Sequence, residues 1–119
     1  MNDVRDSEPD ADATRQQLID LFLRRSLTEV EQMRRAVPSL IKGDDPVWRD
    51  LRFNAQRIAG TASGLQLGIL SACAKELAAL ADERFTRVTL DAHFLLTVTS
   101  AIEMVAIELA RLLSGGPRP

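Results

Sequence analysis

Imidazole and thiol side chains, which are frequent catalytic nucleophiles, general bases and metal ligands, are scarce in this 119-residue chain. His93 is the only histidine and Cys73 the only cysteine, so a Ser-His-Asp or Cys-His arrangement would depend on His93 as its base. Cys73 has the spacing of a core position, which favours a buried thiol over a reactive one. The sequence has no phosphate-binding glycine motif and no Cys/His cluster for a metal. It therefore predicts no enzyme, no metal and no other cofactor.

The most informative segment runs from Ala55 to Leu70. Its Gly60 falls in the middle of a predicted helix, where glycine costs about 0.5–1 kcal/mol relative to alanine. It follows Gln56 by about one turn, on the same face and off the predicted core stripe. A close approach explains a glycine at this position, either by another helix of the bundle or by a partner from outside. Of these two explanations we favour the partner.

Four stretches have apolar residues at alternating spacings of three and four, which predicts four amphipathic helices. The first runs from about 13 to 37 and ends near Pro38. Asp45 and Pro46 are predicted to cap and open the second helix, and a break lies between Gly64 and Gly68. The third helix ends near 82, the segment 82–89 is a loop, and the fourth helix ends at glycines 115 and 116. The predicted core residues are Ile19, Leu23, Leu27, Val30, Met33, Val37, Trp48, Leu51, Ala55, Ile58, Ala62, Leu65, Leu70, Cys73, Leu77, Leu80, Leu95, Val98, Ile102, Val105, Leu109 and Leu112.

An all-α fold follows, because each helix has one apolar stripe that it cannot bury alone. Short connections favour an antiparallel, up-down-up-down four-helix bundle over residues 13–115. Residues 1–12 are predicted to be a disordered acidic tail and residues 116–119 a frayed C-terminal tail. Glu103 and Glu108 lie off the apolar stripe of the last helix, so we expect both to be solvated.

The formal net charge is −2, which gives no indication of a nucleic-acid partner. The first twelve residues carry −4, so the remainder carries +2, and thirteen of the fifteen basic residues are arginine. This arginine content has two readings, a compositional bias and a surface that faces an acidic partner. Uninterrupted apolar runs are far shorter than the ~20 residues of a membrane-spanning helix. A lone cysteine fits a reducing compartment, so we expect a cytoplasmic protein without a membrane segment.

Residues 14–113 resemble the histidine-containing phosphotransfer (HPt) domain family. On the second long helix of its four-helix bundle, that family has a phosphorylated histidine followed by a characteristic series of small and apolar residues. Counted from Gln56, this series has a hydrophobic residue at +2, glycine at +4, small residues at +5 and +6, and leucine at +14. The matching residues are Ile58, Gly60, Thr61, Ala62 and Leu70, with further likeness at Leu18 to Leu23, Ala36, Asp44 and Leu51.

Three positions depart from the family pattern. Gln56 stands at the histidine position, Ala59 where lysine is common, and Gln66 where glycine is expected, so Gly64 and Gly68 are expected to form the turn instead. The first departure decides the chemistry, because the amide nitrogen of glutamine is not nucleophilic and cannot carry a phosphoryl group. Gln56 can still donate and accept hydrogen bonds.

The resemblance therefore implies a domain of two-component signalling that binds a response-regulator receiver domain or a hybrid histidine kinase without relaying phosphate. Receiver domains present an acidic pocket, which a basic and partly apolar surface would complement. One alternative is a working phosphotransfer protein that uses another residue, such as His93. A second alternative is a helical adaptor or dimerisation module outside phosphorelay. The candidate partner-binding residues are Arg49, Arg52, Phe53, Gln56, Arg57 and Gly60.

Overall fold

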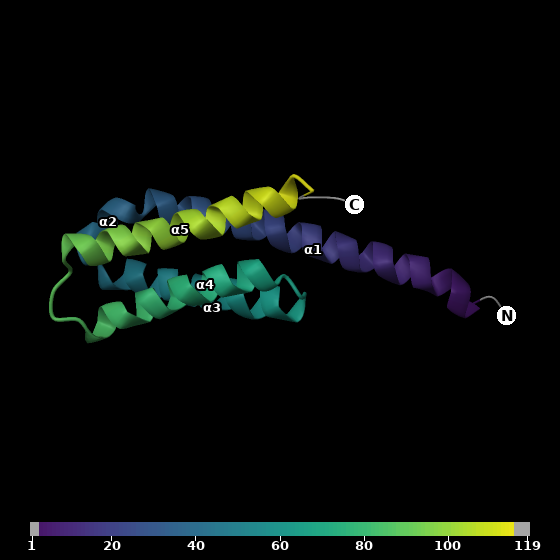
Figure 1. Cartoon of the computed structure of the whole chain (residues 1–119), viewed down its shortest axis with the longest axis horizontal. Coiled ribbons are helices and arrows are strands. Elements are labelled where there is room, and N and C mark those ends of the chain that lie inside the picture. The colour runs from purple at the N-terminus through teal and green to yellow at the C-terminus, as the bar shows by residue number, and fades with distance from the viewer. Residues whose placement is uncertain (1–2, 116–119) are drawn as a thin grey trace.

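The computed structural model describes residues 3–115, and of residues 3–10 only the backbone. The described chain is all-α, as predicted, and contains no strand. The four long helices lie side by side as a helical bundle (Figure 1), with α1 packed on α5, α5 on α4 and α4 on α3. The elements are α1 (Asp3–Arg35), α2 (Val37–Ile41), α3 (Asp45–Gly64), α4 (Gly68–Glu83), the 3-10 helix η1 (Arg84–Thr86) and α5 (Ala92–Leu113).

The first helix differs from the sequence prediction at both ends. It begins at Asp3, so residues 3–12, predicted to be a disordered tail, continue its backbone, and it extends past the other helices (Figure 1). Acidic residues are favourable at a helix N-terminus because they interact with its positive dipole end, a contribution that the prediction of a tail omitted. At the other end Pro38 falls in the first turn of α2, a short helix that was not predicted. The predicted C-terminal tail at 116–119 lies outside the described residues.

The predicted core stripes form one continuous hydrophobic core, to which Leu27, Val37, Leu65, Cys73, Leu80, Leu95 and Leu112 contribute as partly buried members. Trp48 is its largest fully buried side chain, and its ring stacks on Phe94 with 6.0 Å between the ring centroids. The indole Nε1 of Trp48 donates a hydrogen bond of 3.0 Å to the carbonyl of Leu40 on α2. Trp48 thus ties α2, α3 and α5 together at one end of the bundle.

Helices α3 and α4 approach each other through small side chains. Ala55, Ala59 and Ala62 of α3 are buried, and so are Ser71 and Ala74 of α4. The hydroxyl of Ser71 donates to the carbonyl of Ala59 over 3.1 Å. This close seam, together with the tight turn that follows α3, fixes which face of α3 points outward.

The turn between α3 and α4 corrects the predicted role of the glycines. Gly64 ends α3 and Gly68 begins α4, and neither has a positive φ. The left-handed residue is Gln66, with φ 62°. Glycine adopts this conformation at little cost, whereas a residue with a Cβ is strained there. The predicted cap of α3 is also shifted, because Asp44 is the N-cap and Asp45 the first helical residue.

Arginine–carboxylate pairs join helices that are distant in sequence. Arg34 of α1 binds both carboxylate oxygens of Glu103 on α5 at 2.8 Å, which lowers the pKa of Glu103.

Glu108 of α5 was predicted to be solvated, and this prediction is wrong. Its side chain is 7% exposed and accepts hydrogen bonds from Arg111 of the same helix. An apolar stripe cannot reveal such a pair, because Arg111 reaches back one turn to cover the carboxylate.

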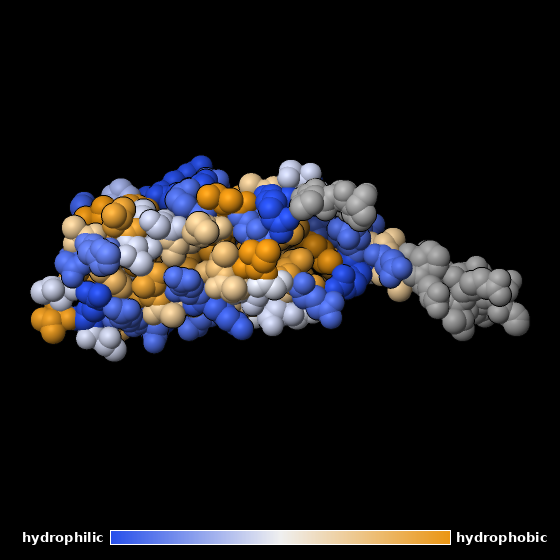
Figure 2. Space-filling view, viewed as in Figure 1, coloured by the Kyte–Doolittle hydropathy of each residue, from blue (hydrophilic) through white to orange (hydrophobic). Residues whose placement is uncertain are grey.

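One helix of the described residues, α5, is long and apolar enough to cross a membrane by length and composition. This is weak evidence, since the core helix of a soluble protein passes the same test and α5 packs on α1 and α4. Apolar residues on the face seen in Figure 2 alternate with polar ones. Three exposed apolar residues of α5 are Leu96, Met104 and Ile107.

Candidate functional site

The outward face of α3 carries the predicted partner-binding residues. Arg49, Phe53, Gln56 and Gly60 are all exposed and follow one another at spacings of four and three, which places them on one face of the helix. This face points away from α4, because Ala55, Ala59 and Ala62 occupy the opposite side. The structure therefore brings these four residues together at the surface; we call them the α3 face.

Phe53 is the apolar centre of the α3 face. Its side chain is 64% exposed, although a buried phenylalanine would stabilise the protein by roughly 1.5–3 kcal/mol more than an exposed one. Single exposed apolar residues are common on protein surfaces. Phe53, however, lies next to Gln56 and Gly60. The α3 face therefore combines an apolar ring, an amide that can form hydrogen bonds and a glycine without a side chain.

The space around Gly60 tests one of the two explanations of this glycine, close packing inside the bundle. A Cβ built on Gly60 has no atom within 4 Å other than those of its own helix. Close packing inside the bundle therefore does not account for the glycine. The alternative explanation, approach of a partner from outside, stays a prediction.

Arg52 and Arg57 flank the α3 face, but both form ion pairs with carboxylates of neighbouring helices in the same chain. Arg52 donates to Asp82 of α4 over 3.1 Å, and its guanidinium lies 4.6 Å from the ring centroid of Phe85. Arg57 pairs with Glu29 of α1 and also donates to Asn54 over 3.1 Å. These two arginines connect α3 to its neighbours, so their contribution to a partner surface is restricted by the fold.

Arg49 differs from both, because its side chain forms no ion pair among the described residues. It lies two turns before Gln56 on the same face. A free guanidinium at an exposed position can accept a carboxylate from a partner in a bidentate geometry. Of the three arginines predicted for the site, Arg49 is therefore the one best able to bind an acidic group.

The structure shows the surroundings of two residues that depart from the HPt pattern, Ala59 and Gln66. Ala59, where lysine is common, is buried against α4, so the α3 face has no cation at that position. Gln66, where glycine is expected, has the left-handed conformation that favours glycine. The opening segment Leu18–Leu23 is split, with Ile19 and Leu23 buried and Leu18 and Leu21 exposed.

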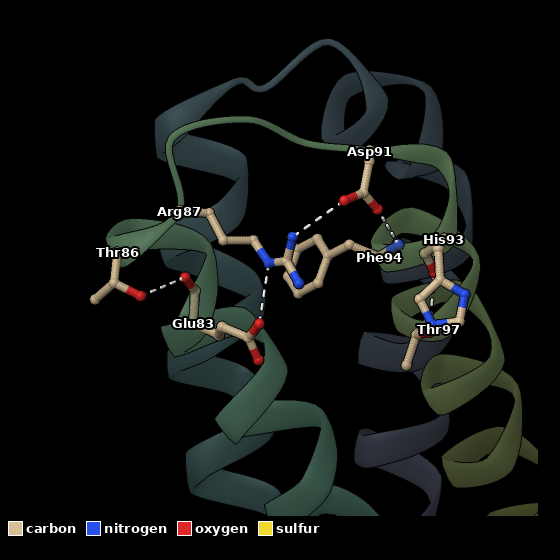
Figure 3. A network of polar contacts seen from close by, with 7 residues as sticks. All are labelled: Glu83, Thr86, Arg87, Asp91, His93, Phe94 and Thr97. Atoms are coloured by element: carbon tan, nitrogen blue, oxygen red, sulfur yellow. Dashed lines mark hydrogen bonds and ion pairs between the residues drawn. The ribbon is translucent and has the colours of Figure 1, made fainter.

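His93, the alternative reactive residue, lies exposed in the first turn of α5. Figure 3 shows its imidazole beside Thr97 and turned away from Arg87. The carboxylate of the N-cap Asp91 accepts a 2.7 Å hydrogen bond from the backbone N–H of Phe94, which lowers the pKa of Asp91. The polar network at this end of the helix therefore caps α5 and does not include the imidazole.

The thiol of Cys73 is half-buried between α4 and α5. Burial raises the pKa of this thiol, and the carboxylates of Glu108 and Glu76 raise it further. A raised pKa lowers the thiolate fraction, so the thiol is a poor nucleophile at neutral pH. Among residues 3–115 no group of three or more His, Cys, Asp or Glu side chains is placed to hold a metal ion.

Two hollows lie away from the α3 face. An apolar groove of about 310 Å³ separates α2 from the first half of α5 and is lined by Leu40, Ile41 and Leu96 among others. Sequence reasoning missed it because α2 was not predicted. A smaller cleft of about 180 Å³ lies between α1 and α3, where Glu29, Asp50 and Asn54 are among its lining residues.

Comparison with known proteins identifies no relative of this chain. No family model matches the chain, and no similar curated protein or solved structure is found.

Proposed function

We propose that this chain is an HPt-like domain of cytoplasmic two-component signalling that binds a receiver domain or a histidine kinase and does not carry phosphate itself. Its four long helices α1, α3, α4 and α5 would form the antiparallel up-down-up-down bundle of that family. Short connections and the packing of α3 on α4 and α4 on α5 support this arrangement. The chain would act as a competitor or as an adaptor.

The observation that carries the proposal is the position of Gln56. It is exposed on α3, one turn before Gly60, whose surface is open. These are the positions at which the family presents its histidine and its glycine. The amide can form hydrogen bonds in an acidic pocket but offers no nucleophilic nitrogen, since its lone pair is delocalised into the carbonyl.

The conformation of Gln66 supports the resemblance independently of the α3 face. The HPt pattern expects glycine ten residues after the histidine position, and Gln66 has the left-handed backbone that explains such a glycine. The agreement concerns a backbone angle, which the side-chain pattern around Gln56 does not determine.

The binding surface would combine Arg49, Phe53, Gln56 and Gly60, with Arg52 and Arg57 at its edges. An acidic receiver pocket would attract Arg49, and Phe53 would supply apolar contact next to the amide. Electrostatic attraction of this kind raises the association rate and weakens as salt increases.

An NMR titration of the labelled chain with receiver domains from the same genome tests the proposal. We expect chemical-shift changes centred on the α3 face, and about tenfold weaker binding for Arg49→Glu and for Phe53→Ser. Lys75→Glu and Ile107→Ser provide matched controls on exposed positions of α4 and α5 and should leave the affinity unchanged. Shifts confined to another face, or no binding across the panel, would refute the proposal and favour the adaptor alternative.

Phosphoryl transfer provides a second, separate readout. In Gln56→His the phosphoryl group would leave the receiver's aspartyl oxygen and form a P–N bond to the new imidazole, whereas the native chain should accept none. A receiver that binds the Gln56→His chain without transferring phosphate would contradict the HPt ancestry. Phosphate on His93 of the native chain would establish the phosphotransfer alternative instead.

A further inference from the structure

The cleft of about 180 Å³ between α1 and α3 lies on a side of the bundle where the helices are much less closely packed than α3 and α4. It holds several times the roughly 30 Å³ that one water molecule occupies in the liquid. It is smaller than the roughly 300–1,000 Å³ of pockets that bind drug-sized ligands. The cleft, which we call the α1–α3 cleft, therefore has the size for a small ligand or for one side chain of a partner.

The floor of the α1–α3 cleft is apolar. Five aliphatic side chains line it, and three of them belong to the buried core of the bundle. No aromatic and no cationic side chain is among its lining residues. A ligand in this cleft therefore needs an aliphatic portion that covers the floor, which consists of Met33, Ala36, Leu40, Val47 and Leu51.

The remaining lining residues all carry side-chain oxygen atoms: Glu29, Gln32, Asp50 and Asn54. Oε2 of Glu29 pairs with Nη2 of Arg57, and the same nitrogen donates to Asn54 over 3.1 Å. Oε1 of Glu29 is buried and accepts no hydrogen bond. A buried carboxylate oxygen without a donor is unfavourable for the folded state, so Glu29 keeps one acceptor for a donor that enters the cleft.

Asp50 provides the uncompensated negative charge of the α1–α3 cleft. The charge of Glu29 is shared with Arg57 and, at 3.7 Å, with Arg25. Asp50 is exposed and forms no ion pair among the residues whose side chains the structure describes. It lies one turn before Asn54 on α3, so both oxygen-bearing side chains face the cleft from the same helix. A ligand with a positive charge would compensate Asp50.

These features fit one chemical group. An ammonium group has three N–H donors for carboxylate and amide oxygens, and an aliphatic stem attached to it can cover an apolar floor. We propose that the α1–α3 cleft binds a primary alkylammonium group, which donates to Glu29 and Asp50 and lays its stem on the apolar floor. A free aliphatic amine and a lysine side chain of a partner protein both offer this chemistry.

Other cations fit the α1–α3 cleft less well. Among the described residues no group of three or more His, Cys, Asp or Glu side chains is placed to hold a metal ion, and a hydrated ion would leave the apolar floor uncovered. A guanidinium binds best to both oxygens of a carboxylate, but Oε2 of Glu29 is already paired with Arg57. A quaternary ammonium is recognised by aromatic rings, which the lining lacks.

An NMR titration of the labelled full chain with pentylamine tests the proposal. We expect a millimolar Kd and chemical-shift changes centred on residues 29–36 and 47–54. Asp50→Asn should weaken binding about tenfold, because a charge-assisted hydrogen bond is lost. Ala36→Leu adds apolar volume to the cleft without changing its charge and should weaken binding too. Glu76→Gln, which removes an exposed carboxylate of α4, should leave the affinity unchanged.

Matched ligands separate the parts of the pentylamine molecule. Pentanol has the stem without the charge, and trimethylpentylammonium has the charge without N–H donors, so both should bind much more weakly than pentylamine. Equal binding of either compound, or stronger binding of calcium ions, would overturn the proposal. An Asp50→Asn chain that is folded by circular dichroism and binds pentylamine as tightly as the native chain would overturn it as well.

A lysine derivative distinguishes the two sources of the alkylammonium group. If the amide of acetylated lysine shifts the same residues as pentylamine, the cleft accepts a lysine side chain of a partner protein. If pentylamine alone does so, the cleft is a site for a free amine, and no shifts with either compound would refute the proposal. These titrations contain no receiver domain, so this proposal and the proposed function can fail separately.

Discussion

Arg57 was predicted to bind a partner, but in the structure it forms an ion pair with Glu29 of α1. Its contribution to the stability of the fold can therefore be measured separately from any contribution to binding. The Glu29 side chain is 12% exposed and that of Arg57 33%, and the other carboxylate oxygen of Glu29 has no hydrogen-bond partner. Replacing Arg57 by methionine keeps the apolar stem and removes the guanidinium. A largely buried carboxylate then loses its principal partner.

The size of the effect follows from the burial of the pair. Exposed ion pairs contribute about 0–1 kcal/mol, whereas removing one partner of a fully buried pair costs roughly 3–5 kcal/mol. Because Arg57 is one-third exposed and water reaches it, we expect Arg57→Met to lower the free energy of unfolding by about 1–2 kcal/mol. For a domain of this size this loss corresponds to a decrease in Tm of about 4–8 °C.

Urea denaturation of a double-mutant cycle measures this coupling. Arg57→Met, Glu29→Gln and the double variant should give a coupling free energy of about 1 kcal/mol, so that the double variant is more stable than the sum of the single effects predicts. Arg49→Met provides the control and should change stability by less than about 0.5 kcal/mol. Single effects that add to within about 0.3–0.5 kcal/mol would refute the reasoning that the pair stabilises the α1–α3 contact.

Three further predictions concern the α3 face, the turn and the acid response. Gly60→Ala should raise the free energy of unfolding by about 0.5–1 kcal/mol in urea denaturation, because its Cβ would meet no neighbouring atom; a destabilised variant would show a contact that the structure lacks. Gln66→Gly should stabilise the chain by up to about 1 kcal/mol in the same assay by relieving the left-handed strain, and no gain would show that this conformation carries little strain. The pKa of Glu103 is lowered by Arg34, so its contribution to stability is present above the unfolded pKa of about 4.3 and is lost as the pH falls below it. Glu103→Gln should therefore lose less stability than the native chain when acidified through that range, and an identical acid response would contradict this assignment.

The sequence predicts the long helices well because their apolar residues repeat over many turns. Leu51, Ala55, Ile58 and Ala62 were predicted to face the core, and all four are buried. The α3 face was predicted by the same periodicity, since exposed positions are those that the core stripe leaves free. Helix geometry thus accounts for the position of Gln56 at the surface without knowledge of the neighbouring helices.

The parts that the sequence did not predict depend on contacts between distant residues. Helix α2 is only five residues long, too short for a periodic pattern, and is held by the contact between Leu40 and Trp48. The turn was expected to form at Gly64 and Gly68, whereas the left-handed residue between α3 and α4 is Gln66. The burial of Glu108 depends on Arg111, one turn away, and no apolar pattern contains that information.

The arginines show most clearly why residue type alone does not define a binding surface. Arg49, Arg52 and Arg57 are alike in sequence, but Arg52 and Arg57 bind carboxylates of neighbouring helices. A partner that recruited Arg57 would first have to replace its contact with Glu29, which costs part of the binding free energy. Arg49 requires no such exchange, so its substitution should weaken a complex while leaving stability unchanged. Equal losses of binding affinity and equal losses of folding stability in Arg49→Glu and Arg57→Glu would contradict this distinction. Arg49 would then not differ from Arg57, the arginine that stabilises the contact between α1 and α3.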